Sequence, residues 1–167
     1  MTAAHCGDRD FATVGKHSLD DTSDGIRHKV CKTSLHPEWN EWTKDFDFAI
    51  LHLEKPVEFG PRVTPACLPA RRFDGGWDGL DWMQTGKKMT VSGWGQFTYD
   101  NYKTPSKLHG VKVPGVTNER CREMFQDFPI KITSNMLCAG DAENGGVDSC
   151  RGDSGGLYTL TAFLSHK

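Results

Sequence analysis

Three side chains in this sequence have types and neighbours suited to acyl transfer: His5, Asp47 and Ser154. Ser154 lies in the run Cys150-Arg151-Gly152-Asp153-Ser154-Gly155-Gly156, whose glycines allow backbone conformations closed to other residues. Such a loop can expose the Ser154 hydroxyl while the main-chain N–H groups of Gly152 and Ser154 converge on one point. A nucleophile beside converging N–H donors suits attack on a carbonyl. Taken alone, the segment is explained equally well as a glycine-rich turn with a polar tip.

A serine nucleophile needs a base and a group that orients the base. His5 follows three small or apolar residues and precedes Cys6; judged alone, it is more often a packed structural residue than a catalyst. Asp47 leads the apolar run Phe48-Ala49-Ile50-Leu51, which predicts a strand buried on both sides. A carboxylate at the mouth of such a strand needs a cation or N–H donors, although a surface acid is the simpler interpretation of Asp47 alone.

Composition narrows the class of protein. A chain of 167 residues can form one domain or two small ones, each with a core. The formal net charge of -2 predicts no nucleic-acid partner, and the absence of an apolar run of about 18 residues predicts no membrane span. Six cysteines without a C-x-x-C pair favour disulfides in an oxidising compartment. The N-terminus has no signal-peptide pattern.

The chain predicts short strands, many turns and one brief helix, which together indicate an all-β fold. We expect a solvated polar loop over residues 7–25 and an irregular connection over 59–88. Thr117 is expected to cap a helix running from about residue 118 to 125. Strands are expected at 30–37, 47–53, 89–95, 108–113 (stopped by Pro114), 130–137 and 157–164.

Four motifs in order resemble the chymotrypsin/trypsin family of serine endopeptidases: Thr2-Ala3-Ala4-His5-Cys6, Asp47-Phe48-Ala49-Ile50-Leu51, Val91-Ser92-Gly93-Trp94-Gly95 and Gly152-Asp153-Ser154-Gly155-Gly156. The resemblance covers essentially the whole chain. It implies two antiparallel β-barrels of the trypsin-like type with the active site in the cleft between them. The implied domains are 1–66, carrying His5 and Asp47, and 67–167, carrying Asp148 and Ser154, both incomplete.

The resemblance assigns roles to individual residues. His5 would be the general base, Asp47 its orienting acid and Ser154 the nucleophile, with the N–H groups of Gly152 and Ser154 forming the oxyanion hole. Asp148 would lie at the base of the specificity pocket and select Arg or Lys, although a loop acid is the alternative. No cofactor or metal is implied. The expected partners are polypeptide substrates with Arg or Lys at the cleaved bond, an activating protease and protein inhibitors.

The resemblance also describes the cysteines and the ends of the chain. Cys121 would pair with Cys138; the partners of Cys6, Cys67 and Cys150 would lie outside this sequence, and Cys31 has no counterpart. Family segments upstream and downstream are missing, and in active members a freed α-ammonium pairs with the acid matching Asp153. Without that amine Asp153 would be a buried charge lacking its partner. We therefore expect a secreted protease in an incomplete or zymogen-like form.

Two other classes of function compete with an active peptidase. A non-catalytic protease homologue, acting as a binding or regulatory module, would have the same scaffold, but such proteins usually have a broken triad. A metal-binding domain could use the side chains of His5, Cys6, His28 and Cys31. The spacing of His28 and Cys31 suits a metal, but no second compact pair accompanies them.

Overall fold

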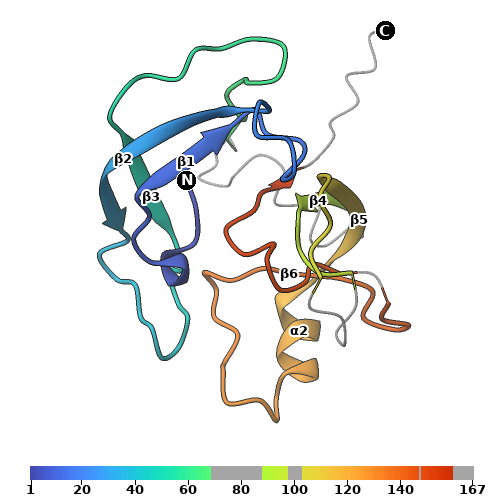
Figure 1. The fold of residues 1–167 in the computed structure, drawn as a ribbon. Helices are drawn as coiled ribbons and strands as arrows, with labels where there is room; N and C mark the ends of the chain where they lie inside the picture. The colour runs from blue at the N-terminus through green and yellow to red at the C-terminus, as the bar shows by residue number, and fades with distance from the viewer. Residues whose placement is uncertain (69–87, 98–102, 147, 160–167) are drawn as a thin grey trace, which may run out of the picture.

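The structure is a computed structural model that describes residues 1–68, 88–97, 103–146 and 148–159. It contains two antiparallel sheets, as Figure 1 shows. The first has the strand order β1-β2-β3 and the second the order β6-β5-β4-β7. The strands are β1 (Phe11–Val14), β2 (Ile26–Leu35), β3 (Ala49–Leu53), β4 (Lys88–Gly93), β5 (His109–Val116), β6 (Cys138–Ala139) and β7 (Tyr158–Thr159). The other elements among the described residues are a 3-10 turn, η1 (Ala4–Cys6), and an α-helix, α2 (Asn118–Met124).

This β-rich arrangement confirms the all-β prediction. Within the described residues the two sheets are open and neither closes into a barrel. The proposed domain boundary at residue 66 falls between β3 and β4, in a stretch that continues into residues outside the described part. That boundary stays a prediction, as does the irregular connection over 59–88, most of which lies outside the described residues.

The first sheet contains β3, the strand that follows Asp47. β2 pairs with β3 from Leu35 opposite Ala49 to Val30 opposite Leu53, with a register shift between Val30 and Lys32. The expectation that this strand is buried on both sides is wrong. Ala49 is 1% exposed whereas its neighbour Ile50 is 42% exposed. Because successive side chains of a strand point to opposite faces, only one face of β3 is covered.

Among the described residues, the second sheet and helix α2 together supply most of the buried apolar side chains. Met89 and Val91 of β4, Val113 of β5 and Cys121 of α2 are each almost fully buried. Contrary to expectation, β5 continues through Pro114, which faces Lys88 at the end of β4. Proline lacks an N–H donor, but here the strand is changing partner, and the following residues pair with β6 instead.

Helix α2 begins where the sequence predicts. The Thr117 side chain accepts a hydrogen bond from the Arg120 N–H at 3.3 Å. The strand expected at 130–137 is not formed, however; a turn occupies Thr133–Met136, and only the two-residue β6 follows it. The Asn118 amide donates to the carbonyls of both Thr133 and Met136, which stabilises this turn in place of a strand. The last strand, β7, covers two residues of the expected 157–164; residues 160–164 lie outside the described part.

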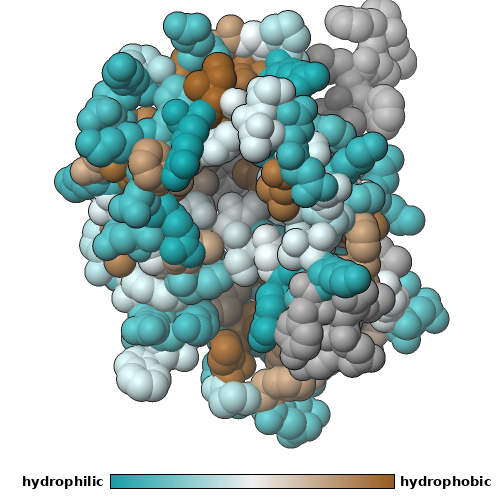
Figure 2. All heavy atoms as spheres, in the orientation of Figure 1, coloured by the Kyte–Doolittle hydropathy of each residue, from teal (hydrophilic) through white to brown (hydrophobic). Residues whose placement is uncertain are grey.

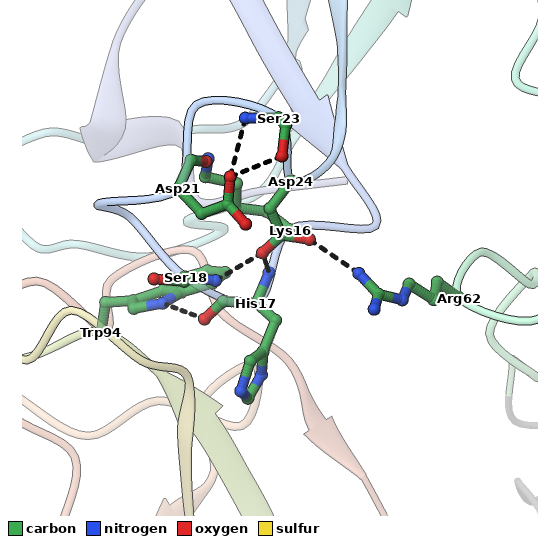
Figure 3. Close-up of polar contacts among 8 residues, drawn as sticks. All are labelled: Lys16, His17, Ser18, Asp21, Ser23, Asp24, Arg62 and Trp94. Atoms are coloured by element: carbon green, nitrogen blue, oxygen red, sulfur yellow. Dashed lines mark hydrogen bonds and ion pairs between the residues drawn. The ribbon is translucent and has the colours of Figure 1, made fainter.

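The polar segment 7–25 is not a solvated loop. It contains β1, and Asp24 within it is 8% exposed. Figure 3 shows the reason: the Asp24 carboxylate accepts the N–H groups of His17 and Ser18, each at 2.6 Å, and pairs with Arg62 at 2.9 Å. The His17 carbonyl in turn accepts the Trp94 indole N–H at 3.2 Å, so this loop joins the two halves of the molecule.

The surface mixes polar and apolar side chains. In Figure 2 the apolar residues of this face form separate patches among polar ones. Trp42 is 90% exposed and Phe59 is 68% exposed. Among the described residues, no helix has the length and hydrophobicity that a membrane crossing requires.

Candidate active site

His5 is carried on the short turn η1 and held close to the start of β3. Thr2 and Ala49 exchange two main-chain hydrogen bonds, at 2.9 and 2.8 Å, which fix the segment before the turn. Ala4, inside η1, is 3% exposed and anchors the turn beneath the surface. His5 itself remains exposed. The anchored turn therefore holds the His5 imidazole in a fixed position at the surface.

Asp47 contacts His5 at two points. Its Oδ1 accepts the main-chain N–H of His5 at 2.8 Å, and its Oδ2 lies 2.5 Å from the ring Nδ1. The side chains are 38% exposed for His5 and 25% exposed for Asp47. A proton on Nδ1 facing the carboxylate leaves Nε2 with a free lone pair, the state in which imidazole can accept a proton. The structure brings these two predicted residues together.

The loop containing Ser154 lies against the His5 turn. The Cys6 thiol lies 3.7 Å from the Ser154 carbonyl oxygen, and a Cβ on Gly155 would collide with the Thr2 hydroxyl. Gly155 has φ +78°, so glycine is required here both for the backbone conformation and for the close approach. Ser154 is exposed. Of the hydrogen bonds within the described chain, none joins the Ser154 side chain to the His5 ring.

The two predicted oxyanion donors lie in this same loop. Gly152 has φ +104°, and its Cα faces the Gly95 backbone. Turns in which Asp153 donates to Cys150 and Gly156 donates to Asp153 fold the loop back on itself. In the part of the chain that the structure describes, neither the Gly152 nor the Ser154 N–H has an acceptor. Both donors are therefore available to a ligand.

Asp153 points inward, away from the neighbouring Ser154. Its carboxylate accepts the N–H of Gly95 at 2.7 Å and the N–H of Cys150 at 2.9 Å. The sequence had suggested a buried charge without a partner, whereas here each oxygen has a backbone donor. Main-chain N–H groups from two segments therefore hold this half-buried carboxylate in place.

Asp148 lies in the wall of a cavity of about 620 Å³ that also includes Val91, Phe97, Ser149 and Asp153. Its Oδ1 accepts the N–H of Ser149 at 2.7 Å. The side chain is exposed, and no cation pairs with it among the described residues. An accessible carboxylate facing open volume is suited to an incoming cation. Its role in specificity remains a prediction.

The structure tests the predicted disulfide and the metal-binding alternative. Cys121 and Cys138 form a disulfide with a Cα–Cα distance of 6.3 Å, which agrees with the pairing that the resemblance implies. Cys6, Cys31, Cys67 and Cys150 are free thiols. The four residues of the metal-binding alternative do not form a site: within the described residues no group of three or more His, Cys, Asp or Glu side chains could hold a metal ion.

The sequence did not indicate the structural roles of two acids, Asp45 and Asp24. Asp45 accepts hydrogen bonds from Thr133 and Asn135, which lie on the other half of the molecule. Asp24 orders the loop that contacts Trp94. The sequence shows Asp45 only as an acid two positions before Asp47, and nothing near it indicates partners 88 and 90 residues away.

Comparisons with known proteins identify the class. Residues 1–160 match the family model described as trypsin. The chain is 37% identical over 168 residues to the serine proteinase stubble of Drosophila melanogaster and 36% identical over 158 residues to trypsin 5G1 of Aedes aegypti. These matches cover 93% of this chain each, and 20% and 55% of the relatives. The clotting factor G beta subunit of Tachypleus tridentatus is 34% identical, over 93% of this chain and 52% of that protein.

A solved structure has the same fold. Neuropsin, a serine protease expressed in the limbic system of mouse brain, superposes with a TM-score of 0.73 at 28% identity. The match covers 94% of this chain and 65% of neuropsin. The chain therefore belongs to the trypsin family of serine proteases. It spans between a fifth and about half of the length of these curated relatives.

Proposed function

We propose that this chain is the catalytic part of a serine endopeptidase that cleaves after Arg or Lys, with His5, Asp47 and Ser154 as its triad. The observation that carries the proposal is the two-point contact of Asp47 with His5, on a turn that packs against the Ser154 loop. The family assignment supports peptide-bond hydrolysis as the reaction. The intact triad weighs against the alternative of a non-catalytic homologue.

The proposed reaction starts at Ser154. Its Oγ attacks the carbonyl carbon of the substrate while His5 Nε2 takes the hydroxyl proton. The resulting oxyanion accepts hydrogen bonds from the N–H groups of Gly152 and Ser154. Collapse breaks the C–N bond, and His5 gives the proton to the leaving amine. Water then attacks the acyl ester, again with His5 as base, which releases the acid and restores the Ser154 hydroxyl. Asp47 stabilises the imidazolium throughout.

The preference for Arg or Lys is proposed from Asp148. Its carboxylate is exposed beside the cavity of about 620 Å³ and has no paired cation in the described structure. A guanidinium or ammonium group would satisfy it through charge-assisted hydrogen bonds.

We propose a secreted protein with polypeptide substrates; an activating protease and protein inhibitors are proposed as further partners.

We also propose that the arrangement described here is a resting, zymogen-like form. The structure has the His5–Asp47 contact but no hydrogen bond from Ser154 to the His5 ring in its described part. Catalytic hydrogen bonds are often long or absent before substrate binds, so this geometry is compatible with a later active state. We expect slow reaction of Ser154 in the chain alone.

A fluorophosphonate probe tests this function directly. We expect the purified chain to be labelled slowly at Ser154, and not at all after Ser154→Ala. Asp47→Asn should lower the labelling rate by up to about 10⁴-fold, a magnitude taken from the family's triad template and not from this structure. Labelling that is unaffected by Ser154→Ala or His5→Ala would refute the triad, and rapid labelling would refute the resting form.

The specificity is tested by comparing the cleavage of peptides with Arg, Lys or Phe at the cleaved bond by wild type and by Asp148→Ser.

A further inference from the structure

The carboxylate of Asp45 joins the two halves of the molecule close to the proposed site. Its Oδ1 accepts the Thr133 hydroxyl at 2.7 Å and the Asn135 amide at 3.2 Å, and its Oδ2 lies 3.3 Å from the same amide. Asp45 lies between β2 and β3, two residues before Asp47. Its partners lie between α2 and β6, in the half that carries Ser154. One half-buried carboxylate therefore connects the segment carrying Asp47 to the opposite half.

The turn that holds Asp45 is itself well anchored. The Asn118 amide, at the first turn of α2, donates to the carbonyls of Thr133 and Met136. The Thr133 Oγ1 that donates to Asp45 also accepts the Asn135 N–H at 3.2 Å. The disulfide between Cys121 and Cys138 ties α2 to β6 on either side of this turn. Asp45 therefore contacts a part of the chain whose position is fixed by covalent and hydrogen-bonded links.

The segment around Asp45 needs such an anchor. Its two neighbours, Lys44 and Phe46, have φ angles of 58° and 52°, in the left-handed region that side chains other than glycine disfavour. Residues in such conformations are strained and persist only where their surroundings hold them. The Phe46 ring stacks on His36 with a centroid distance of 4.6 Å. The Asp45 carboxylate supplies the hold on the other side.

The contact depends on hydrogen bonds and not on an ion pair. The pKa of Asp45 is held below its ordinary range mainly by the Thr133 hydroxyl, with help from the Asn135 amide and the Phe46 N–H, against the opposing effect of burial. Asp45 is therefore an ionised acceptor at neutral pH. No Lys, Arg or His pairs with it within the described residues. Removing the acceptor oxygens, and not simply the charge, should break the contact.

We propose that Asp45 is a positioning residue: by holding the strained Lys44–Phe46 segment against Thr133 and Asn135, it sets Asp47, and through it His5, relative to Ser154. The catalytic part of this inference rests on the proposed function. Asp45 touches neither the reacting atoms nor His5. A displacement of about 1 Å at a catalytic group can lower a rate by about 10²-fold, so a link outside the site can matter.

Four variants of the full chain separate positioning from general stability. Asp45→Ala removes the acceptor, and Asp45→Asn retains an oxygen that can accept from Thr133. Thr133→Val removes the hydroxyl that donates to Asp45 and accepts the Asn135 N–H, with little change in shape. Asp21→Asn is the matched control, because Asp21 is also a carboxylate whose pKa is lowered by hydrogen bonds, yet its side-chain partner, Ser23, lies within its own turn.

The first readout is the rate at which Ser154 reacts with a fluorophosphonate. We expect Asp45→Ala to react about 10²-fold more slowly, in line with the cost of a displaced catalytic group. Asp45→Asn should recover part of that loss, and Asp21→Asn should react at the wild-type rate. The double variant Asp45→Ala/Thr133→Val should be no slower than Asp45→Ala alone, because in this proposal Thr133 acts on Asp47 only through the Asp45 carboxylate. Additive effects of the two changes would contradict the proposal.

The second readout does not need activity. The main-chain N–H of His5 donates to Asp47 Oδ1, so its hydrogen exchange reports whether Asp47 is in place. We expect faster exchange at His5 and at residues 44–48 in Asp45→Ala, with the rest of the first sheet unchanged. If wild type is not labelled at all, the proposed function fails while this measurement still tests the positioning. Unchanged exchange at His5, or a uniform increase across the first sheet, would overturn the positioning role.

Discussion

Hydrogen-bond geometry gives the His5–Asp47 pair its chemical character. One carboxylate oxygen accepts the histidine main-chain N–H and the other lies against Nδ1. The main-chain bond fixes where the residue is, and the ring bond fixes how the imidazole is oriented and which nitrogen carries the proton. A carboxylate contacting the ring alone would not restrain the main chain at His5. The two-point contact therefore positions the imidazole that we propose as the base.

Two glycines, Gly93 and Gly95, leave room for the inward-pointing Asp153 carboxylate, and replacement of Gly95 gives a prediction. Gly95 is buried, and a Cβ there would collide with the Asp153 carboxylate that accepts the Gly95 N–H. We expect Gly95→Ala to lower the free energy of unfolding by about 1–3 kcal/mol, as overpacking does, measured by urea denaturation. Gly110→Ala is the matched control, since a Cβ there would make only ordinary contacts at 3.6 Å. Equal stability of the two variants would contradict the assigned collision.

At the scale of elements, the short helix α2 depends on its N-terminal cap and on the residues that it packs against. Helix α2 has seven residues, and isolated helices of this length are unstable in water. It forms because Thr117 caps it, Cys121 is buried beneath it, and the disulfide ties it to β6. The same helix holds the Thr133 turn through Asn118. Stability of α2 is therefore linked to the position of the turn that contacts Asp45.

The cap of α2 can be tested by itself. Thr117→Ala removes the side-chain acceptor of the Arg120 N–H and leaves that donor to water. We expect a loss of about 1 kcal/mol in the free energy of unfolding, the typical effect of removing such a cap. Thr104→Ala, at an exposed threonine outside any helix, is the control and should have little effect. If Thr117→Ala and Thr104→Ala have the same unfolding midpoint, the Thr117 cap does not stabilise the protein.

At the scale of the whole molecule, the described contacts between the halves lie at three places. The loop 16–24 contacts the second half through Trp94 and through hydrogen bonds to Ser106 and Leu108. Asp45 makes the second contact, and the Thr2–Cys6 segment against Gly155 makes the third. The buried Asp24 carboxylate and the half-buried Asp45 carboxylate organise two of these three places. The relative position of the halves, and of the site between them, should therefore be sensitive to acid.

This acid sensitivity can be predicted with its sign. The pKa of Asp24 is lowered, first by the Ser18 N–H and then by the His17 N–H, with Arg62 and Lys16 adding favourable charge against the opposing effect of burial. Since the unfolded chain binds the proton more tightly, the contribution of Asp24 to stability is complete above its ordinary pKa of 3.8 and is lost as the pH falls below it. Asp45 acts in the same direction.

Urea midpoints measured from neutral pH into this acid range check the prediction. We expect wild type to lose stability on acidification and Asp24→Asn to show a lower midpoint at neutral pH with a flatter pH dependence. Asp20→Asn, an exposed acid in the same segment, should follow wild type. If Asp24→Asn keeps the wild-type slope, the Asp24 carboxylate does not contribute to the acid transition.

Sequence alone was sufficient for the family, the all-β class, the α2 cap and the pairing of Cys121 with Cys138, because each depends on local residue patterns or on motifs in a fixed order. It failed where a strand pattern competed with distant partners. Residues 130–137 have apolar positions suited to a strand, but Asn118 makes a turn there, and β5 passes through Pro114 because its partner changes at that point. The burial of Asp24 and the link from Asp45 to Thr133 were decided only by the tertiary structure. A carboxylate looks the same in the sequence whether it is solvated or buried, because its state depends on donors that folding brings from elsewhere in the chain.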